Sequence, residues 1–252
     1  MKTLNIVIPM AGRGQRFQDA GYAFPKPLID VNGKTMIELV VNNIKPQIPH
    51  RFIFICQKEH YEKYDLHSVL KNATNNNFEA VLLTGITAGA ACTVLTASKF
   101  INTDEPLLLA NSDQFVETNI NDFIKSASEQ KTDGLIMTFK ANHPKWSYAR
   151  VLPDSTKVIE VAEKKVISDN STVGIYYFKR GKDFVEAAKK MIEKNIRYNN
   201  EFYVCPVYNE LILKNLNIHI HPISNGKMHG LGTPEDLEAF LKKLNQGQVK
   251  IS

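Results

Sequence analysis

The chain of 252 residues has an ordinary globular composition, with 43% hydrophobic residues, 23% charged residues and a net charge of +5. It contains no apolar run near the roughly 20 residues that a membrane span needs and no clustered basic stripe typical of nucleic-acid binders, so neither a membrane nor a nucleic acid is an expected partner. Its three cysteines lack CxxC spacing and no secretory signal pattern precedes the first strand, which argues against a disulfide framework and a zinc site and predicts a cytoplasmic protein.

Short apolar runs alternate with segments of helical period over the first 140 residues. We expect strands at 5–8, 51–56, 80–83, 106–110 and 134–139. Helices are expected at 36–44, 60–71, 88–100 and 120–129. This alternation predicts an α/β fold with a Rossmann-like, mixed but mostly parallel sheet and helices on both faces. In such sheets ligands bind at the carboxyl ends of the strands.

The pattern changes after residue 140 to short strands linked by turns, followed by helices. The expected strands are 148–152, 157–161 and 172–178, and the expected helices are 181–194, 201–214 and 234–244. The last helix has a strong start signal, with Thr233 as N-cap and Pro234 in the first turn. We expect one domain, 1–252, whose second half, 141–252, is a smaller α+β part. Residues 245–252 are expected to form a loose tail or an oligomer contact.

The loop that follows the first strand carries glycines and positive charge. Gly12 and Gly14 allow the backbone to bend and to approach phosphate oxygens closely. Arg16 supplies positive charge for a polyphosphate, and so does Lys26, which two flanking prolines restrict in direction. A tight strand-to-helix turn is the structural alternative. The loop lacks the third glycine and the downstream acid of a dinucleotide site, and it lacks the GK[ST] of a P-loop.

The order of strand, GxGxR and PKPL resembles the sugar-nucleotide pyrophosphorylases, which join a nucleoside triphosphate to a phosphorylated sugar. The chain reads Ala11-Gly12-Arg13-Gly14-Gln15-Arg16 and then Pro25-Lys26-Pro27-Leu28. Its opening, residues 9–12, is similar to a subgroup associated with capsule and surface-polysaccharide genes. The resemblance implies a GT-A-like fold, with a nucleotide-binding half at 1–140 and an acceptor-binding half at 141–252. It also implies that Ala11, Gly12 and Gly14 contact the nucleotide.

Two further segments of the first half follow the order of that family. Residues 87–91 resemble its base-binding stretch, which implies that Thr87 and Gly89 lie against the base, although small residues here are equally typical of close helix packing. Asp113 ends a buried strand, where a carboxylate is a good Mg²⁺ ligand or a simple turn residue. The matching Asp of the family binds the metal, and the neighbouring Ser112 is expected at the nucleotide.

The second half contains the expected acceptor site. Glu163-Lys164-Lys165 is similar to the family's EKP, whose Lys grips the acceptor phosphate, with Lys165 in place of Pro; elsewhere such a sequence is usually a solvated charge cluster. Glu201 matches a Glu that binds acceptor hydroxyls, or it is a capping acid in the first turn of a helix. The complete set of expected acceptor residues is Tyr148, Glu163, Lys164, Gly174 and Glu201.

The last motif, residues 228–234, departs from the pattern that it resembles. The family has WxDxGTP here, whereas this chain has Met228 for the Trp and Gly230 for the Asp that is usually a second metal ligand. The departure leaves open which group replaces that Asp, and it disfavours an ordinary hexose 1-phosphate as acceptor. His229 is either structural or an acceptor contact.

These observations predict an Mg²⁺-dependent nucleotidyltransferase that uses Arg16, Lys26, Asp113 and Lys164 for catalysis. An acceptor phosphate would attack the α-phosphorus of the triphosphate and release pyrophosphate. The resemblance to shorter family members favours CTP over dTTP or UTP, and the acceptor is a phosphorylated sugar, a polyol phosphate or another small phosphate. A nucleotide-dependent oxidoreductase and a non-catalytic nucleotide-binding module are the alternatives, and a homodimer is possible.

Overall fold

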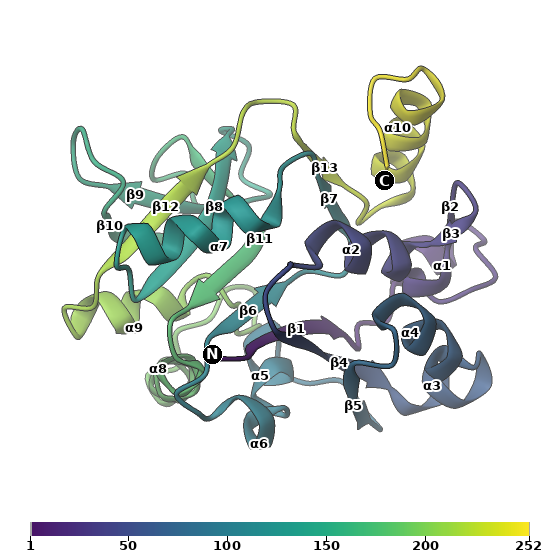
Figure 1. Cartoon of the computed structure of the whole chain (residues 1–252), viewed down its shortest axis with the longest axis horizontal. Helices are drawn as coiled ribbons and strands as arrows, with labels where there is room; N and C mark the ends of the chain where they lie inside the picture. Colours follow the sequence, from purple (N-terminus) through teal and green to yellow (C-terminus); the bar gives the residue numbers. More distant parts are fainter. Residues whose placement is uncertain (1, 252) are drawn as a thin grey trace.

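The computed structural model describes residues 2–251, which form a nine-stranded mixed sheet with helices on both faces (Figure 1). The central path runs in the order β10-β9-β11-β6-β1-β4-β5, with β8 beside β11 and β12 beside β8. The strands are β1 Leu4–Met10, β4 His50–Gln57, β5 Phe78–Leu83, β6 Leu107–Ala110, β8 Gly134–Lys140, β9 Ser147–Val151, β10 Val158–Glu163, β11 Asn170–Phe178 and β12 Ile218–Pro222. The predicted α/β architecture is confirmed.

The sheet is parallel in its first part and mixed in its second. β6, β1, β4 and β5 run parallel, so the carboxyl ends of β1 and β6 share one edge. β11 is antiparallel to β6, β8 and β9, and β9 is antiparallel to β10. Strands from both sequence halves therefore belong to one continuous sheet.

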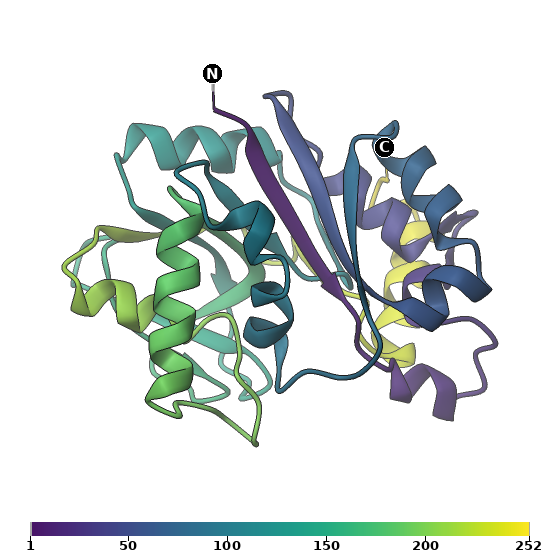
Figure 2. The same ribbon diagram turned by 90° about the horizontal axis from the view of Figure 1, so that it is seen from below.

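Two hydrophobic clusters fix the helices to opposite faces of the sheet, and Figure 2 shows green α8 and blue α4 on the two sides of purple β1. One face is covered by α2 Met36–Ile44, α4 Leu66–Thr74 and α7 Ile120–Glu129. The other face is covered by α5 Ala90–Leu95, α6 Ser98–Ile101, α8 Gly181–Glu193 and α9 Val207–Leu213. α2 begins with a complete capping box in which Thr35 and Glu38 satisfy each other's backbone N–H groups.

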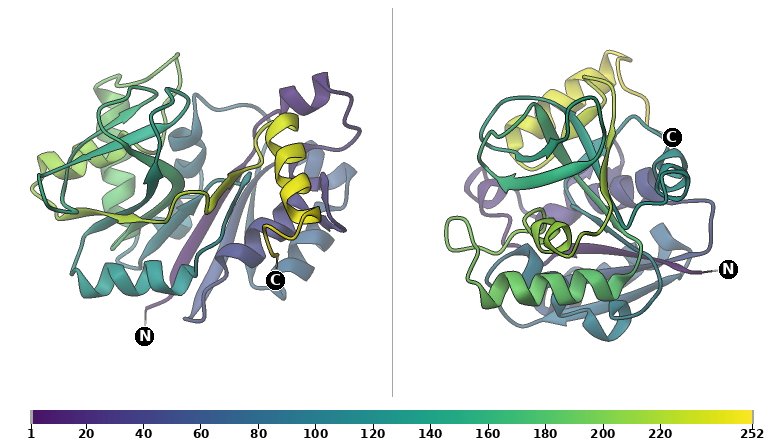
Figure 3. Two further views of the ribbon diagram at one scale, coloured as in Figure 1. Left: turned by 90° about the horizontal axis from the view of Figure 1, so that it is seen from above. Right: turned by 90° about the vertical axis from the view of Figure 1, so that its left-hand side faces the viewer.

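A third cluster lies beside the glycine loop, where the C-terminal segment returns to the N-terminal one, as the yellow helix in Figure 3 shows. The elements that surround it are α1 Gln15–Asp19, the 3₁₀ turn η1 Lys26–Leu28, β2 Asp30–Val31, β3 Lys34–Thr35, β7 Gln114–Val116, β13 Met228–Gly230 and α10 Pro234–Asn245. Thr233 caps α10 by accepting a hydrogen bond from the backbone N–H of Asp236, as predicted.

Several predicted boundaries are wrong. The expected helix 60–71 is two helices, α3 Lys58–Lys63 and α4, because Asp65 adopts a left-handed conformation with φ 45°. The expected helix 88–100 is divided into α5 and α6. The expected helix 201–214 begins only at Val207, after Pro206. The tail is not loose up to residue 251, since Val249 is 3% exposed and packs in the third cluster.

Within residues 2–251, no helix is both long enough and apolar enough to cross a membrane.

Candidate active site

A close ion pair joins the two charged residues expected at the triphosphate. Lys26 begins η1, and its Nζ lies 2.7 Å from Oδ2 of Asp113, which follows β6. The two side chains are 22% and 27% exposed, so the pair is partly shielded but open to a ligand. Gly14 makes room for this arrangement: its φ is +64°, and a Cβ there would lie 3.2 Å from the Cβ of Lys26.

Asp113 is held by the ladder between β7 and β13. Gly230 pairs with Gln114, and the next residue, Leu231, donates its backbone N–H to the carbonyl of Asp113 at 2.8 Å. Gly232 passes directly over the carboxylate, because a Cβ there would lie 3.0 Å from Oδ2. The 228–234 motif thus supports Asp113 even though it lacks the expected carboxylate.

Asp113 fits a magnesium ion bound through one protein ligand. Its Oδ1 makes no hydrogen bond to any residue between 2 and 251. No group of three His, Cys, Asp or Glu side chains with metal-binding geometry occurs among those residues. Mg²⁺ characteristically takes one or two carboxylates and completes its octahedron with phosphate oxygens and water. A single carboxylate with one open oxygen beside the glycine loop matches that preference.

Gly230 has no side chain, and the carboxylate of Asp236 lies close to the place that a side chain would occupy. A Cβ built at Gly230 would lie 3.7 Å from Oδ2 of Asp236, whose other oxygen is 3.8 Å from Nζ of Lys145. His229, in contrast, is structural: it is buried, its Nε2 lies 3.0 Å from Glu117 Oε1, and its ring packs against Phe240.

Arg16 lies in α1 and is exposed. Within the described part of the chain its guanidinium makes no hydrogen bond or ion pair. Hydrogen bonds at the start of α10 lower the pKa of Glu235, and the charge of Arg16 adds to this effect. Arg16 is therefore close enough to the start of α10 to act on Glu235, and it has no partner among residues 2–251.

The other expected nucleotide contacts differ in how the fold uses them. The Ala11 carbonyl accepts a 2.6 Å hydrogen bond from Gln57, at the end of β4. Gly12 has open space where a Cβ would be, so packing in the protein alone does not require glycine there. Ser112 is buried beside Asp113.

Residues 87–91 are joined to the acceptor half through Phe202. Phe202 donates its N–H to the Ala88 carbonyl at 2.8 Å and accepts from the Ala91 N–H at 2.9 Å. Gly89 has φ +126°, and a Cβ there would lie 2.5 Å from the Phe202 nitrogen. The Thr87 hydroxyl bonds to the Gly89 carbonyl and lies 2.6 Å from the Thr93 hydroxyl, which stiffens the loop.

Lys164 is positioned by two tyrosines that the sequence analysis did not assign. Its Nζ donates to the Tyr203 hydroxyl at 2.9 Å, and it lies 4.8 Å from the Tyr203 ring centroid and 5.5 Å from that of Tyr198. The backbone of Lys164 is left-handed, with φ 50°, and its N–H donates to the Trp146 carbonyl. Contacts with these two tyrosines therefore fix the position of the Lys164 ammonium group.

Glu163 and Glu201 lie near this lysine in different environments. Glu163 accepts a short hydrogen bond from Ser147; burial raises its pKa, while that hydrogen bond and the charge of Lys164 oppose the rise. Glu201 is exposed in a turn closed by Tyr198, not in a helical first turn, so it does not cap a helix. Burial and the Glu201 carboxylate both raise the pKa of Tyr203, which keeps its hydroxyl protonated.

Two predicted acceptor residues have structural roles in this fold. Tyr148 is fully buried, and its hydroxyl donates to the His143 carbonyl, so it offers no surface to an acceptor. Gly174 has φ +93°, and a Cβ there would overlap the Asn111 side chain. Its carbonyl accepts from the Asn111 N–H, so it joins β11 to the segment that carries Asp113.

The strand register brings the two charged groups to one edge of the sheet. Gly174 of β11 is bonded to Asn111, Ser171 of β11 pairs with Tyr148, and Ser147 of β9 pairs with Glu163. The Lys26–Asp113 pair and Lys164 thus lie along the same edge, separated by β11 and β9. An edge with two separate cationic positions is suited to holding two anions for transfer between them.

The chain is similar to known proteins over most of its length. Residues 6–244 match the model of the nucleotidyl transferase family. The chain is 25% identical over 257 residues to the bifunctional protein GlmU of Buchnera aphidicola, covering 98% of this chain and 52% of that protein. The chain spans about half the length of the curated relatives that it matches.

Solved structures extend the similarity to whole chains. The nucleoside-diphosphate-sugar pyrophosphorylase of Vibrio cholerae RC9 superposes with a TM-score of 0.81 at 30% identity, covering 94% of this chain and 99% of that one. The inositol-1-phosphate CTP transferase of T. maritima superposes with a TM-score of 0.76 at 13% identity, covering 100% and 99%, which shows a shared fold.

Proposed function

The chain belongs to the nucleotidyl transferase family, and from that premise we propose that it joins a nucleoside triphosphate to a small phosphorylated acceptor and releases pyrophosphate. The observation that carries this proposal is the placement of two cationic positions on one sheet edge. Lys26 beside Asp113 serves the triphosphate, and Lys164 on Tyr203 serves the acceptor. The two sequence halves, 1–140 and 141–252, would then act as donor and acceptor sides of one site.

The proposed reaction needs no side-chain nucleophile. A phosphate oxygen of the acceptor forms a bond to the α-phosphorus, and the bond from the α-phosphorus to the bridging oxygen breaks. Pyrophosphate leaves with that electron pair. A phosphate dianion is already a competent nucleophile, so the protein must position two anions and offset their mutual repulsion.

Each charged residue has one role in this proposal. Lys26 binds the triphosphate, and Arg16, which has no partner in residues 2–251, neutralises the leaving pyrophosphate. Lys164 holds the attacking phosphate, with Glu201 available to acceptor hydroxyls. Asp113 would hold Mg²⁺, which supplies charge neutralisation at the phosphates when bound.

CTP and a polyol-type or other non-hexose phosphate are the favoured substrates. Gly230 stands where the family has an Asp, and this difference disfavours an ordinary hexose 1-phosphate as acceptor. The fold shared with an inositol-1-phosphate CTP transferase is compatible with a different acceptor. The 9–12 opening supports a role in supplying precursors for capsule or surface polysaccharide. The three free cysteines are consistent with the proposed cytoplasmic location.

A pyrophosphate-release assay tests this proposal. The purified chain is incubated with Mg²⁺, one of CTP, UTP or dTTP, and one of a set of sugar phosphates and polyol phosphates. We expect release with at least one pair and none after chelation of the metal. Tight nucleotide binding without release for any pair would instead establish a non-catalytic nucleotide-binding module.

A further inference from the structure

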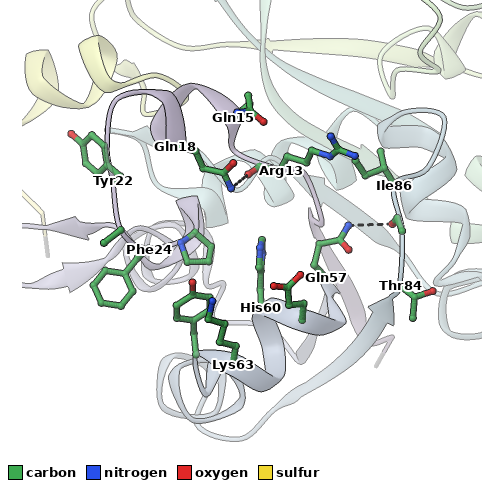
Figure 4. A pocket seen from close by; sticks show the side chains of 15 residues that line it. Arg13, Gln15, Gln18, Tyr22, Phe24, Gln57, His60, Lys63, Thr84 and Ile86 are labelled. Atoms are coloured by element: carbon green, nitrogen blue, oxygen red, sulfur yellow. Dashed lines mark hydrogen bonds between the residues drawn. The ribbon is translucent and has the colours of Figure 1, made fainter.

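A cavity of about 590 Å³ lies beyond the glycine loop at the carboxyl ends of β1, β4 and β5 (Figure 4). Its walls come from α1, from α3 and from the loop after β5, and Gln57 at the end of β4 is among its lining residues. This volume is in the range of small-molecule sites and accommodates a nucleoside. Because Arg13 of the glycine loop also lines it, the cavity adjoins the proposed triphosphate site.

The hydrogen bonds of Gln57 fix which way its amide faces. Its Nε2 donates to the Ala11 carbonyl at 2.6 Å and to the Gly85 carbonyl at 3.1 Å, which uses both of its protons. The opposite orientation would set an amide oxygen against two carbonyl oxygens, so it is excluded. Figure 4 shows the Gln57 nitrogen directed to Gly85 and its oxygen on the other side of the amide. That oxygen makes no hydrogen bond to residues 2–251, and it is a fixed acceptor.

The surroundings of Gln57 suit a flat ring attached to a phosphate chain. Figure 4 shows the Arg13 side chain extending toward Ile86 on the same side of the cavity as Gln57. Ile86 is 58% exposed, and the Arg13 guanidinium has no hydrogen-bond or ion-pair partner in residues 2–251. A planar guanidinium and an apolar side chain are both good stacking surfaces for a base.

We propose that Gln57 determines base specificity by accepting a hydrogen bond from an exocyclic amino group, which selects cytosine over uracil and thymine. Cytosine presents an amino donor where uracil and thymine present a carbonyl oxygen. A carbonyl oxygen facing Gln57 Oε1 would leave two acceptors opposed, with neither satisfied. This inference rests on the proposed function and specifies CTP as the nucleotide that the proposed reaction uses.

The test is equilibrium binding of CTP and of UTP to the full chain by calorimetry, without any acceptor. We expect wild type to bind CTP about 10-fold more tightly than UTP, the worth of one hydrogen bond near 1.4 kcal/mol. Gln57→Met should reduce this ratio to about 1–2, because its thioether is only a weak acceptor for the amino group. Loss of the bonds to Ala11 and Gly85 would weaken both nucleotides alike, so the ratio isolates base recognition.

Gln18→Met is the matched control. Gln18 lines the same cavity, but its amide donates to the Arg13 carbonyl, so its substitution should leave the CTP to UTP ratio unchanged. If the wild-type protein bound CTP and UTP equally, the inference would be overturned. It would also be overturned if Gln57→Met kept the wild-type ratio of CTP to UTP affinity. Because the assay requires no turnover, absence of pyrophosphate release in the acceptor panel would refute the transfer reaction and leave this result standing.

Discussion

In the proposed reaction, Lys26 is the residue on which the triphosphate side of the site depends. In the free protein it neutralises Asp113 across 2.7 Å, and both partners remain partly open. Under the proposal, a triphosphate would meet the lysine, while the open Asp113 oxygen would stay available to a cation. The pair would then hold a carboxylate and an ammonium close together until opposite charges from substrate and metal took their places.

We expect Lys26→Ala to lower kcat/KM by about 10²-fold or more, because removal of a preorganised charge at developing negative charge typically costs this much. The assay is pyrophosphate release with the best substrate pair. Lys189→Ala is the control, since Lys189 is exposed on α8 and has no ionic partner in residues 2–251; its rate should stay within about twofold. Near-normal turnover in Lys26→Ala would remove this residue from the catalytic site.

Tyr203 acts at the same scale on the acceptor side. Tyr203→Phe keeps the ring over Lys164 and removes the hydroxyl that accepts its 2.9 Å hydrogen bond. A hydrogen bond to a charged group contributes about 1.5–3 kcal/mol, so we expect the acceptor KM to rise at least about 10-fold. The nucleotide KM should not change, because the donor side is untouched.

Tyr198→Phe is the matched control for that experiment. Tyr198 contacts Lys164 only through its ring, so loss of its hydroxyl should leave both KM values near those of wild type. If the two variants behaved alike, or if Tyr203→Phe raised the nucleotide KM equally, the hydroxyl would have no specific role in orienting Lys164.

At the scale of elements, the loop after β5 and the segment before α9 form one unit. Their two backbone hydrogen bonds, from Phe202 to Ala88 and from Ala91 to Phe202, require a close approach that only glycine permits at position 89. The segment also carries Glu201 and Tyr203, so the expected base-binding loop and the acceptor side share a backbone connection.

Gly89→Ala should therefore destabilise the fold. The added Cβ would meet backbone atoms of Phe202 at 2.5–2.6 Å and would occupy φ +126°. Overpacking and backbone strain together predict a loss of about 2–4 kcal/mol in the free energy of unfolding, measured by urea denaturation. Gly85→Ala, which has open space and an ordinary φ, should change it by less than about 0.5 kcal/mol. Equal stability of the two variants would contradict this packing argument.

The elements that the sequence predicted best are those whose local signals agree with the tertiary fold. α2 and α7 begin and end as predicted, because Thr35 and Asn119 cap them and their apolar residues keep helical spacing. The break at Asp65 carries no Gly or Pro signal, because aspartate itself adopts the left-handed conformation there. The predicted helix 201–214 overlooked Pro206, although a helix tolerates proline only at its start, and α9 begins directly after this residue.

Site residues could be predicted from the sequence where the charge of a single side chain suggests its role. They could not be predicted where the role depends on which residues lie next to that side chain in the fold. Lys26 and Asp113 come together as their motifs indicated. Tyr203 was missed because its importance arises from Lys164, 39 positions earlier in the chain. The burial of Tyr148 was not predictable, because a tyrosine in sequence does not reveal whether its hydroxyl faces a cavity or, as here, a buried carbonyl.

At the scale of the whole molecule, the third hydrophobic cluster joins the C-terminal segment to the triphosphate side. It contains Phe17, next to Arg16, and Ile29, which follows η1 and Lys26. Leu237 and Phe240 of α10 pack on them, and Val249 closes the cluster. Residues more than 200 positions apart thus pack together beneath the two segments that carry Arg16 and Lys26.

This arrangement predicts that a change in the tail reaches the donor side. Val249→Ala removes two buried methyl groups and adds only a small cavity, so we expect a loss of about 1.5 kcal/mol in the free energy of unfolding by urea denaturation. Because the same cluster supports Phe17 and Ile29, the nucleotide Kd should also rise, whereas the acceptor KM should not. Val166→Ala is the control, since Val166 is 45% exposed and its substitution should alter neither quantity. A destabilised Val249→Ala protein with unchanged nucleotide affinity would show that the cluster supports the fold without setting the position of Arg16 and Lys26.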